Sequence, residues 1–446
     1  MTHVKRAFWG GLLLLSLLWV FAETLVFQAS GLMAWRDPMI QYTGILAIGC
    51  MSGAMVLALR PRWPERWLGG LDKMYRLHKW LGIGALCLSV LHWGWSQGPK
   101  WAVGLGLIQR PVRGARVPVE DPIQAFFLSL RGPAEGLGEW AFYISVVLIA
   151  LALMTFFPYR LFFKTHRILA VTYLVLAFHT VVLMKLSYWA TPVGWATGAM
   201  LLAGIWAAII VLLRRVGASR KVRGRIVALE YYPGVRSLET EIEIPTGWPG
   251  HRPGQFAFAT SNPSEGAHPY TIASHWNPDS PRIRFITKEL GDHTATLRQT
   301  LAIGKDVTVE GPYGCFTFDD DRPNQIWIGG GIGITPFIAR MKHLARDPVA
   351  AGIRIDLFHT TAEVDETALT KLTEDARNAS IGLHLLIDAR DGRLNGQRIR
   401  DTVPNWHEAS IWFCGPAGFG EAIRKDFAAQ GFPVARHFHQ ELFDMR

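Results

Sequence analysis

The chain has 446 residues, of which half are hydrophobic and 18% are charged, and its mean hydropathy is +0.16. This composition excludes a disordered or fibrous protein, and the length predicts two or three domains. The four cysteines, at positions 50, 87, 315 and 414, are too few and too scattered for a disulfide scaffold or a zinc ribbon.

Positive charge is concentrated in the first half of the chain. Residues 1–216 contain 20 Lys and Arg against 8 Asp and Glu, a net charge of +12, whereas residues 217–446 contain 26 against 28, a net charge of −2. The basic excess therefore lies in the apolar half. This argues against a nucleic-acid-binding surface and for cationic loops that flank membrane helices.

Several apolar runs in the first half approach the roughly 20 residues that a membrane-spanning helix needs. We therefore predict a bundle of six transmembrane helices. The alternative for the first run is a cleaved signal peptide, because Lys5 and Arg6 precede it, although no clear small-residue cleavage site follows. The runs are 7–22 (continuing past Glu23 to about 27), 38–59, 80–99, 140–159, 168–184 and 186–213.

Lysine and arginine in short connections indicate the orientation of such a bundle. The N-terminal tail, connections 60–76 and 160–167, and the segment after 213 are rich in these residues and fall on one side. Both termini are therefore expected to be cytoplasmic. Connection 100–138 carries both signs of charge and is long enough to weaken the rule.

The pattern changes after about residue 220. Short β-type runs separated by Pro and Gly turns predict a small antiparallel β-barrel at 217–320. From Gln325 strands alternate with helical stretches, which predicts an α/β domain with a parallel sheet at 321–446. With the helical membrane domain at 1–216, the chain is expected to have three domains.

Four histidines are predicted to lie at or near bilayer depth. His78 and His92 belong to the third predicted helix, and His166 and His179 to the fifth. A spacing of 14 residues is about four turns and places two side chains on one face, whereas a spacing of 13 requires the helix to bend or roll. Since both helices run in the same direction, His78 should pair with His166 and His92 with His179.

Ionisable side chains inside a membrane are costly and indicate function. Two imidazoles from opposite helices are the axial ligands that a helical bundle offers to haem. Copper or zinc is the alternative, but two ligands without a nearby Cys or carboxylate make a poor site for either metal. Any one of these histidines could be an ordinary hydrogen-bonded core residue; two pairs with matched spacing favour haem.

The second half contains three motifs that are typical of cofactor binding. Gly329–Pro336 follows an apolar strand and opens a helix, so its backbone can approach a pyrophosphate. His268–Thr271 places an aromatic ring beside hydroxyl groups, a combination that can stack on a flavin and hydrogen-bond its edges. Gly291–Thr294 offers backbone amides and a hydroxyl at a helix start, although alone it could be a plain turn.

Together these features resemble the ferric reductase and NADPH oxidase superfamily, and most closely its bacterial predicted ferric reductases. In this family a six-helix cytochrome b core is fused to a ferredoxin-reductase-like flavoprotein. The resemblance covers nearly the whole chain. It rests on the paired histidines, His268–Thr271, Gly329–Pro336, Cys414-Gly415-Pro416, Gly138–Tyr143 and Thr165–Arg167.

The resemblance implies specific roles for residues of both halves. The four paired histidines would bind two haems b, Cys414 would lie beside the nicotinamide near the hydride path, and Phe443 would cover the flavin. The residues implied to bind FAD are His268, Pro269, Tyr270, Thr271, Gly291, Asp292, His293 and Thr294. Those implied to bind the nicotinamide nucleotide are Gly330, Gly331, Gly333, Ile334, Thr335, Gly415 and Pro416.

Two stretches depart from the family pattern. Leu357–Glu363 lacks a Lys or Arg to pair with a 2′-phosphate, and Glu363 suits a free ribose hydroxyl, so the sequence favours NADH unless Arg390 or Arg393 contacts a phosphate. Connection 186–192 is too short to cover an outer haem, which weakens the inference of a superoxide product. The longer connection 97–138 could cover that site instead.

The implied function is transmembrane electron transfer from NAD(P)H, through FAD and two haems, to an acceptor on the outer face. A ferric chelate is the first candidate acceptor, oxygen reduced to superoxide or hydrogen peroxide is the second, and a quinone is not excluded. A cytochrome b relay subunit for a periplasmic protein partner is a further alternative. The expected partners are the lipid bilayer, the nucleotide and the acceptor, with no nucleic acid, and the expected location is a bacterial inner membrane.

Overall fold

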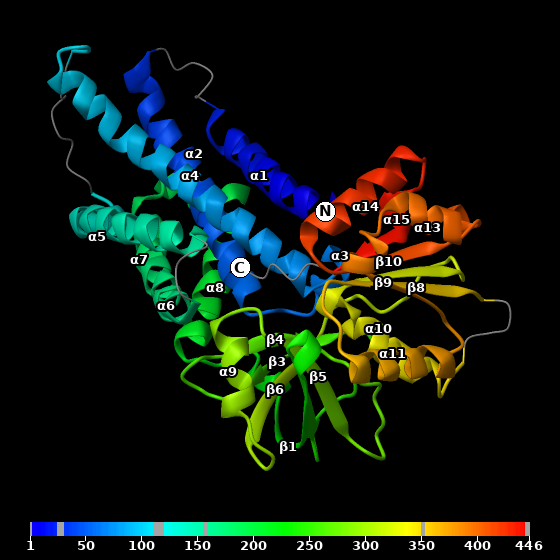
Figure 1. Cartoon of the computed structure of the whole chain (residues 1–446). Helices are drawn as coiled ribbons and strands as arrows, with labels where there is room; N and C mark the ends of the chain where they lie inside the picture. Colours follow the sequence, from blue (N-terminus) through cyan, green and yellow to red (C-terminus); the bar gives the residue numbers. More distant parts are fainter. Residues whose placement is uncertain (1, 25–30, 110–119, 155–158, 349–352, 442–446) are drawn as a thin grey trace. The chain divides into compact units, whose positions relative to one another are not determined.

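The computed structural model describes residues 2–24, 31–109, 120–154, 159–348 and 353–441 (Figure 1). The chain divides into two compact units. The first is helical and comprises residues 1–68 and 73–216, and the second comprises residues 69–72 and 217–445.

The first unit consists of helices. Among its described residues, α1, α2, α5 and α8 are long and apolar enough to cross a membrane. The two helices that carry most of the paired histidines are not among these four, because α7 has only 16 residues and α4 contains more polar side chains. The helices are α1 (Thr2–Ala22), α2 (Leu32–Ala58), α3 (Glu65–Leu68), α4 (Leu71–Gly104), α5 (Pro122–Leu153), α6 (Tyr159–Thr165), α7 (Ile168–Leu183), η2 (Leu186–Ala190) and α8 (Pro192–Leu212).

The expected loop at 97–138 is wrong, because most of it is helical. α4 continues to Gly104 and α5 begins at Pro122. The start of α5 has a strong local cause: the Asp121 carboxylate accepts the backbone N–H of Ile123 at 2.8 Å, and Pro122 occupies the first helical turn. Between the two helices lie residues 105–121, of which 110–119 are outside the described residues.

One expected helix is interrupted: the run 186–213 is divided at Thr191 into η2 and α8, since Pro192 starts a new helix. The expected run 168–184 corresponds to α7, but His166 does not belong to it. His166 and Arg167 form a turn between α7 and the short helix α6, which lies in the expected connection 160–167. The turn supplies the change of direction that the 13-residue spacing of His166 and His179 requires.

Small residues and buried hydrogen bonds hold the helical unit together. α5 packs along α7, and α2 packs along α8. Tyr173 of α7 is fully buried, and its hydroxyl lies 2.9 Å from the Ser52 hydroxyl of α2. A Cβ atom at Gly204 of α8 would lie 2.0 Å from the same hydroxyl, so the close packing of α7 on α8 depends on this glycine.

The second unit begins with an antiparallel sheet of six strands in the order β4-β3-β6-β1-β2-β5. In β5 alternate residues are buried, as expected for a sheet with one face on a core. A bridge between Ile272 and Phe285 connects the chain after β4 to β5. The elements are β1 (Lys221–Tyr232), β2 (Ser237–Glu243), β3 (Phe256–Thr260), β4 (His268–Thr271), β5 (Arg282–Lys288), α9 (Asp292–Thr300) and β6 (Asp306–Tyr313).

The unit continues with a parallel sheet of five strands in the order β11-β10-β7-β8-β9, as predicted for this part of the chain. Helices α10 and α11 cover one face, and α13 and α14 cover the other (Figure 1). The elements are β7 (Gln325–Gly330), α10 (Thr335–Leu344), β8 (Ile355–Thr361), α11 (Glu366–Asn378), β9 (Gly382–Ile387), α12 (Asp388–Asp391), α13 (Gly396–Thr402), β10 (Ser410–Cys414), α14 (Ala417–Ala429), α15 (Val434–His437) and β11 (Phe438–Gln440).

This strand order creates a switch point between β7 and β10. The chain proceeds from β7 to β8 and β9 on one side, and then returns to place β10 on the other side of β7. In open α/β sheets ligands bind outside the carboxyl ends of the strands at such a point. Gly330 and Cys414 are the last residues of the two strands.

Candidate functional site

The structure brings the four histidines of the helical unit together in two pairs. The ring centroids of His92 in α4 and His179 in α7 are 6.2 Å apart. Those of His78 in α4 and His166 in the turn between α6 and α7 are 5.9 Å apart. The pairing is the one expected from the spacing.

Three of these rings are fixed by the same kind of hydrogen bond. Nδ1 of His78 lies 2.9 Å from the Ala54 carbonyl oxygen. Nδ1 of His92 lies 2.9 Å from the carbonyl oxygen of Ile40, and Nδ1 of His179 lies 2.8 Å from that of Ala134. Because a carbonyl only accepts, each Nδ1 must carry the proton, and Nε2 of the neutral ring keeps its lone pair. This is the tautomer of a metal-binding histidine whose orientation is set by its other nitrogen.

His166 is held differently. Its Nδ1 is buried and has no hydrogen-bond partner among the described residues. The Phe162 ring stacks on the His166 ring, with centroids 4.9 Å apart and planes inclined by 28°. Packing, rather than a hydrogen bond, therefore orients this fourth ring.

The distances within both pairs fit one metal ion between the rings. Two imidazoles bound from opposite sides through bonds of about 2 Å place their ring centroids about 6 Å apart. The His92–His179 pair also lines a cavity of about 590 Å³, which extends between α2, α4, α5 and α7. Lys100 of α4 and Arg131 of α5 also line this cavity, so part of the segment 97–138 lies beside the His92–His179 pair.

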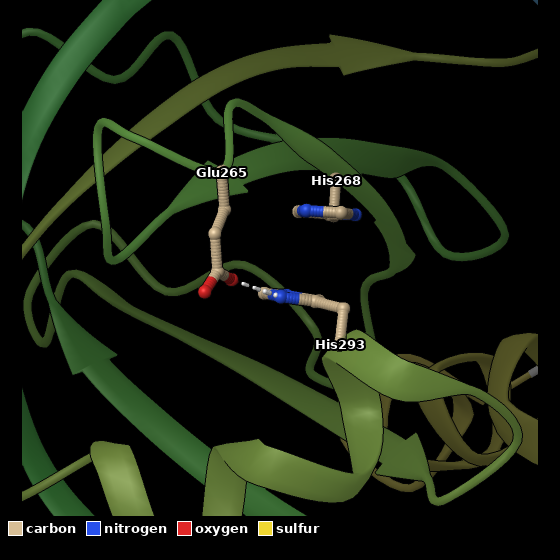
Figure 2. A group of neighbouring side chains, drawn as sticks. All are labelled: Glu265, His268 and His293. Atoms are coloured by element: carbon tan, nitrogen blue, oxygen red, sulfur yellow. Dashed lines mark hydrogen bonds and ion pairs between the residues drawn. The ribbon is translucent and has the colours of Figure 1, made fainter. Parts of the chain in front are cut away.

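In the second unit, the two expected flavin segments lie side by side. The His268 ring of β4 and the His293 ring of α9 stack in parallel, with centroids 3.6 Å apart and planes inclined by 7° (Figure 2). Nδ1 of His293 lies 2.6 Å from the Glu265 carboxylate, and its Nε2 lies 2.9 Å from the Tyr270 hydroxyl. Glu265 was not predicted from the sequence, because it stands in a turn before the motif.

The group Glu265, His268 and His293 has donor atoms close enough to suggest a metal site. The ring geometry argues against it, because two parallel stacked imidazoles direct their lone pairs side by side and not towards a common point (Figure 2). Burial, with a further contribution from His293, lowers the pKa of His268 to about 4. The ring is therefore neutral at pH 7, which alone would permit a metal; it is the parallel stacking on His293 that favours a flat surface for a planar ring instead.

The predicted nucleotide segments meet at the switch point of the parallel sheet. Gly329 of β7 pairs with Cys414 of β10, and the Cα of Gly415 would lie 2.9 Å from a Cβ atom at Gly333. A Cβ atom at Gly333 would also lie 2.2 Å from the Cys414 carbonyl oxygen. Gly331 adopts a φ of +55°, which favours glycine. Thr335 then starts α10, so the loop ends at a helix N-terminus.

Cys414 and Phe443 are the two residues that we expected near the path of hydride transfer, and the structure describes only Cys414. The Cys414 side chain is fully buried among core residues such as Phe337 and Trp412. Burial raises the pKa of the Cys414 thiol well above its usual range, so the thiol is protonated. Phe443 lies outside the described residues.

The sequence suggested that Glu363 could bind a ribose hydroxyl, but in the structure its carboxylate is already paired. It forms ion pairs with Arg236 at 2.7 Å and with Lys288 at 2.6 Å. These partners lower the pKa of Glu363. Arg236 and Lys288 belong to the antiparallel sheet and its connections. They are far from Glu363 in the sequence, so these ion pairs could not be predicted from the residues around Glu363. Arg390 is paired with Asp391.

Both parts of the chain are similar to known proteins. Residues 43–177 match the family described as "Ferric reductase like transmembrane component". A glycine betaine monooxygenase reductase subunit from Chromohalobacter salexigens is 25% identical over 190 residues, which cover 39% of this chain and 50% of the relative. A flavohemoprotein from Bordetella pertussis is 32% identical over 168 residues, which cover 34% and 40% of the two chains.

A solved structure with a similar part is the Amycolatopsis cytochrome P450 reductase GcoB, at 22% identity and a TM-score of 0.43, covering 50% of this chain and 70% of that one. The chain spans about half the length of the curated relatives it matches. The chain therefore combines a region that matches the ferric reductase transmembrane family with a region that is similar to reductase components of other enzymes. The matches support an oxidoreductase.

Proposed function

We propose that the chain is a six-span membrane oxidoreductase that transfers electrons from NAD(P)H to an acceptor on the outer face. The observation that carries this proposal is the pairing of four histidines at two levels along α4, three of them within the residues 43–177 that match the ferric reductase family. The nucleotide is bound and FAD is held in residues 217–446. A bacterial inner membrane with cytoplasmic termini is the proposed location, as the loop charges indicate.

The side chains have distinct proposed roles. His78 with His166, and His92 with His179, each bind one haem b through Nε2, while backbone carbonyls keep three of the four rings in the required tautomer. Tyr270 and His268 offer a planar platform to FAD. The proposed binding segments for the flavin pyrophosphate and for the nucleotide are Gly291–Thr294, and Gly330–Thr335 with Gly415 and Pro416, respectively.

When bound, FAD accepts a hydride and releases single electrons, and haem iron carries one electron at a time. The protein itself has to exclude water, set distances and position the partners. The glycines at the switch point bring β7 and β10 close enough to form one binding edge. At this edge Cys414 is a buried, protonated packing residue beside the proposed nucleotide site. Phe443 is still proposed to cover the flavin.

A ferric chelate is our first candidate acceptor. Oxygen, reduced to superoxide or hydrogen peroxide, is the second. A protein acceptor is the third, because the relatives include a reductase subunit and an electron transfer component, which by their names serve other proteins.

The test of the proposed function is the variant His92→Ala in the purified full chain. We expect it to lose the outer haem and the reduction of external acceptors, while NAD(P)H still reduces the flavin. His3→Ala is the matched control, because His3 belongs to the same unit and contacts Trp67 instead of a histidine. Haem content is measured per chain, and full haem content in His92→Ala would refute the ligand assignment.

The acceptor is tested separately with the reduced wild-type chain. Under anaerobic conditions it is mixed with ferric citrate, and in a second experiment with oxygen. Rapid reoxidation by ferric citrate and slow reoxidation by oxygen would support the ferric chelate. The reverse, with superoxide detected, would make oxygen the acceptor, and slow reoxidation by both would favour a protein acceptor.

A further inference from the structure

Two glycines lie directly against the rings of the outer histidine pair. A Cβ atom at Gly138 of α5 would lie 2.0 Å from Nδ1 of His179. A Cβ atom at Gly44 of α2 would lie 3.1 Å from Cε1 and 3.2 Å from Nδ1 of His92. Neither helix carries a paired histidine itself.

Each glycine stands four residues after the carbonyl that holds the same ring. His179 is hydrogen-bonded to the Ala134 carbonyl and contacts Gly138, and His92 is hydrogen-bonded to the Ile40 carbonyl and contacts Gly44. In an α-helix a Cα–Cβ bond tilts towards the N-terminus, so a side chain at position i+4 lies near the carbonyl of residue i. At Gly44 and Gly138 the ring that bonds this carbonyl lies so close to the helix that it occupies the space of a Cβ atom.

We propose that Gly44 and Gly138 are positioning residues that fix the orientation of the outer histidine pair. Each, together with the carbonyl one turn earlier, forms a seat for one imidazole: Ile40 with Gly44 for His92, and Ala134 with Gly138 for His179. The inference rests on the proposed function, because it takes these rings to be haem ligands. The His78–His166 pair has no such glycine. His78 is hydrogen-bonded to the Ala54 carbonyl, and the residue four positions later is Ala58.

The two seats predict effects of different severity. A contact of 2.0 Å to a ring between packed helices cannot be relieved without moving His179, whereas contacts of 3.1 and 3.2 Å require a shift of a few tenths of an ångström. Gly138→Ala should therefore lose one of the two haems per chain and keep the inner one. Gly44→Ala should keep both haems, with a changed electron paramagnetic resonance signal and reduction potential for the outer one.

The chain offers a matched control for each variant. Gly136 lies in α5 two residues before Gly138, and a Cβ atom there would meet nothing within 4 Å. Gly53 lies in α2, and its Cβ atom would lie 3.3 Å from a methyl group of Leu81, a contact similar to that at Gly44 but not to a histidine. Gly136→Ala and Gly53→Ala should match the wild type in haem content and signals.

A double variant keeps the inference testable if Gly138→Ala does not fold. In Gly138→Ala/His179→Ala the ring that causes the clash is absent, so expression and thermal stability should return to those of His179→Ala alone. Two low-spin haems with unchanged signals in Gly138→Ala, or no recovery in the double variant, would overturn the inference. A wild-type chain without two haems would instead overturn the proposed function on which it rests.

Discussion

At the scale of single residues, the edge that we propose to bind the nucleotide has no room for a side chain at residue 333. Gly333 lies over the carbonyl end of β10, where its Cα faces the Cys414 carbonyl oxygen and Gly415. The sequence marks Gly333 only as one glycine among four. The structure distinguishes it from its neighbour Gly331, which needs its conformation but has open space around it.

Gly333→Ala should therefore impair nucleotide binding. Its Cβ atom would lie 2.2 Å from the Cys414 carbonyl oxygen, so either the loop or β10 must move. We expect the rate of flavin reduction by NADH to fall by at least an order of magnitude, while chemical reduction of the flavin by dithionite is unchanged. Stopped-flow absorbance measures both rates.

Gly418→Ala is the control for this variant. Gly418 lies in α14, close in sequence to the same edge, and a Cβ atom there meets nothing within 4 Å. Its reduction rate should equal that of the wild type. An unchanged rate in Gly333→Ala would show that the loop does not need its close approach to β10.

At the scale of elements, the connection after β8 is tied to the antiparallel sheet. Glu363 holds Arg236, which precedes β2, and Lys288, which ends β5. Close by, the backbone N–H of Gly234 donates to the Asp365 carboxylate at 2.9 Å. Arg236 and Lys288 compensate the negative charge of Glu363 just after β8. In folds of this kind the 2′ position of a bound nucleotide lies near the end of the second strand of the parallel sheet, which here is β8.

Replacing Glu363 should shift the choice between NADH and NADPH towards NADPH. In Glu363→Gln the cations Arg236 and Lys288 lose their carboxylate partner, so a 2′-phosphate near this cluster would meet uncompensated positive charge. Because Arg236 and Glu363 are partly exposed, we expect the ratio of the kcat/KM values for NADPH and NADH to rise by less than about tenfold. Arg236→Gln removes one cation and should shift the ratio towards NADH. Steady-state kinetics with both nucleotides measure these ratios, and unchanged ratios in both variants would show that this cluster does not face the 2′ position of the nucleotide.

Several strands of the parallel sheet were predictable from their apolar pattern, whereas the start of α5 was not. The apolar runs 382–387 and 410–414 coincide with β9 and β10, and β7 extends one residue beyond the run 325–329. The first turns of α5 were missed because Arg131, Glu135 and Glu139 interrupt the apolar run, although Arg131 and Glu135 form an ion pair along the helix. β11 was also missed, because three residues are too short for a periodicity.

For the candidate site, sequence spacing identified the four histidines but not what holds them. The pairing follows from helical geometry alone. The carbonyls of Ile40, Ala54 and Ala134, and the glycines of the two seats, belong to α2 and α5, and only tertiary packing brings them to the rings. In the same way, Glu265 and the partners of Glu363 come from distant strands and turns.

At the scale of the whole molecule, buried neutral histidines make stability depend on pH. Burial lowers the pKa of both His251 and His359 to about 4, and that of His268 likewise. His251 shows why: its Nδ1 accepts the Trp248 indole N–H at 3.3 Å and its Nε2 lies 3.0 Å from the Ser274 carbonyl oxygen. A second proton would oppose the indole N–H.

The free energy of unfolding should therefore fall as the pH is lowered from about 6.5 to 4. In this window the unfolded chain binds protons at these histidines and the folded chain does not, so stability rises with pH. Thermal unfolding of the full chain in detergent at pH 7.5, 6 and 5 should show a decreasing Tm. His251→Gln should reduce the slope, and a Tm that stays constant between pH 7.5 and 5 would contradict the assignment.

The continuous helix α4 has a consequence for how this protein can change over evolution. His78 and His92 stand on one unbroken helix, so their angular relation is set by the number of residues between them. Inserting or deleting one residue there would turn one ring by about 100° around the helix axis and separate it from its partner. Substitutions in this stretch are compatible with both sites, but a change in its length is not. The partner histidines differ, because the turn at His166 and Arg167 separates α6 from α7, whereas α4 has no such interruption between His78 and His92.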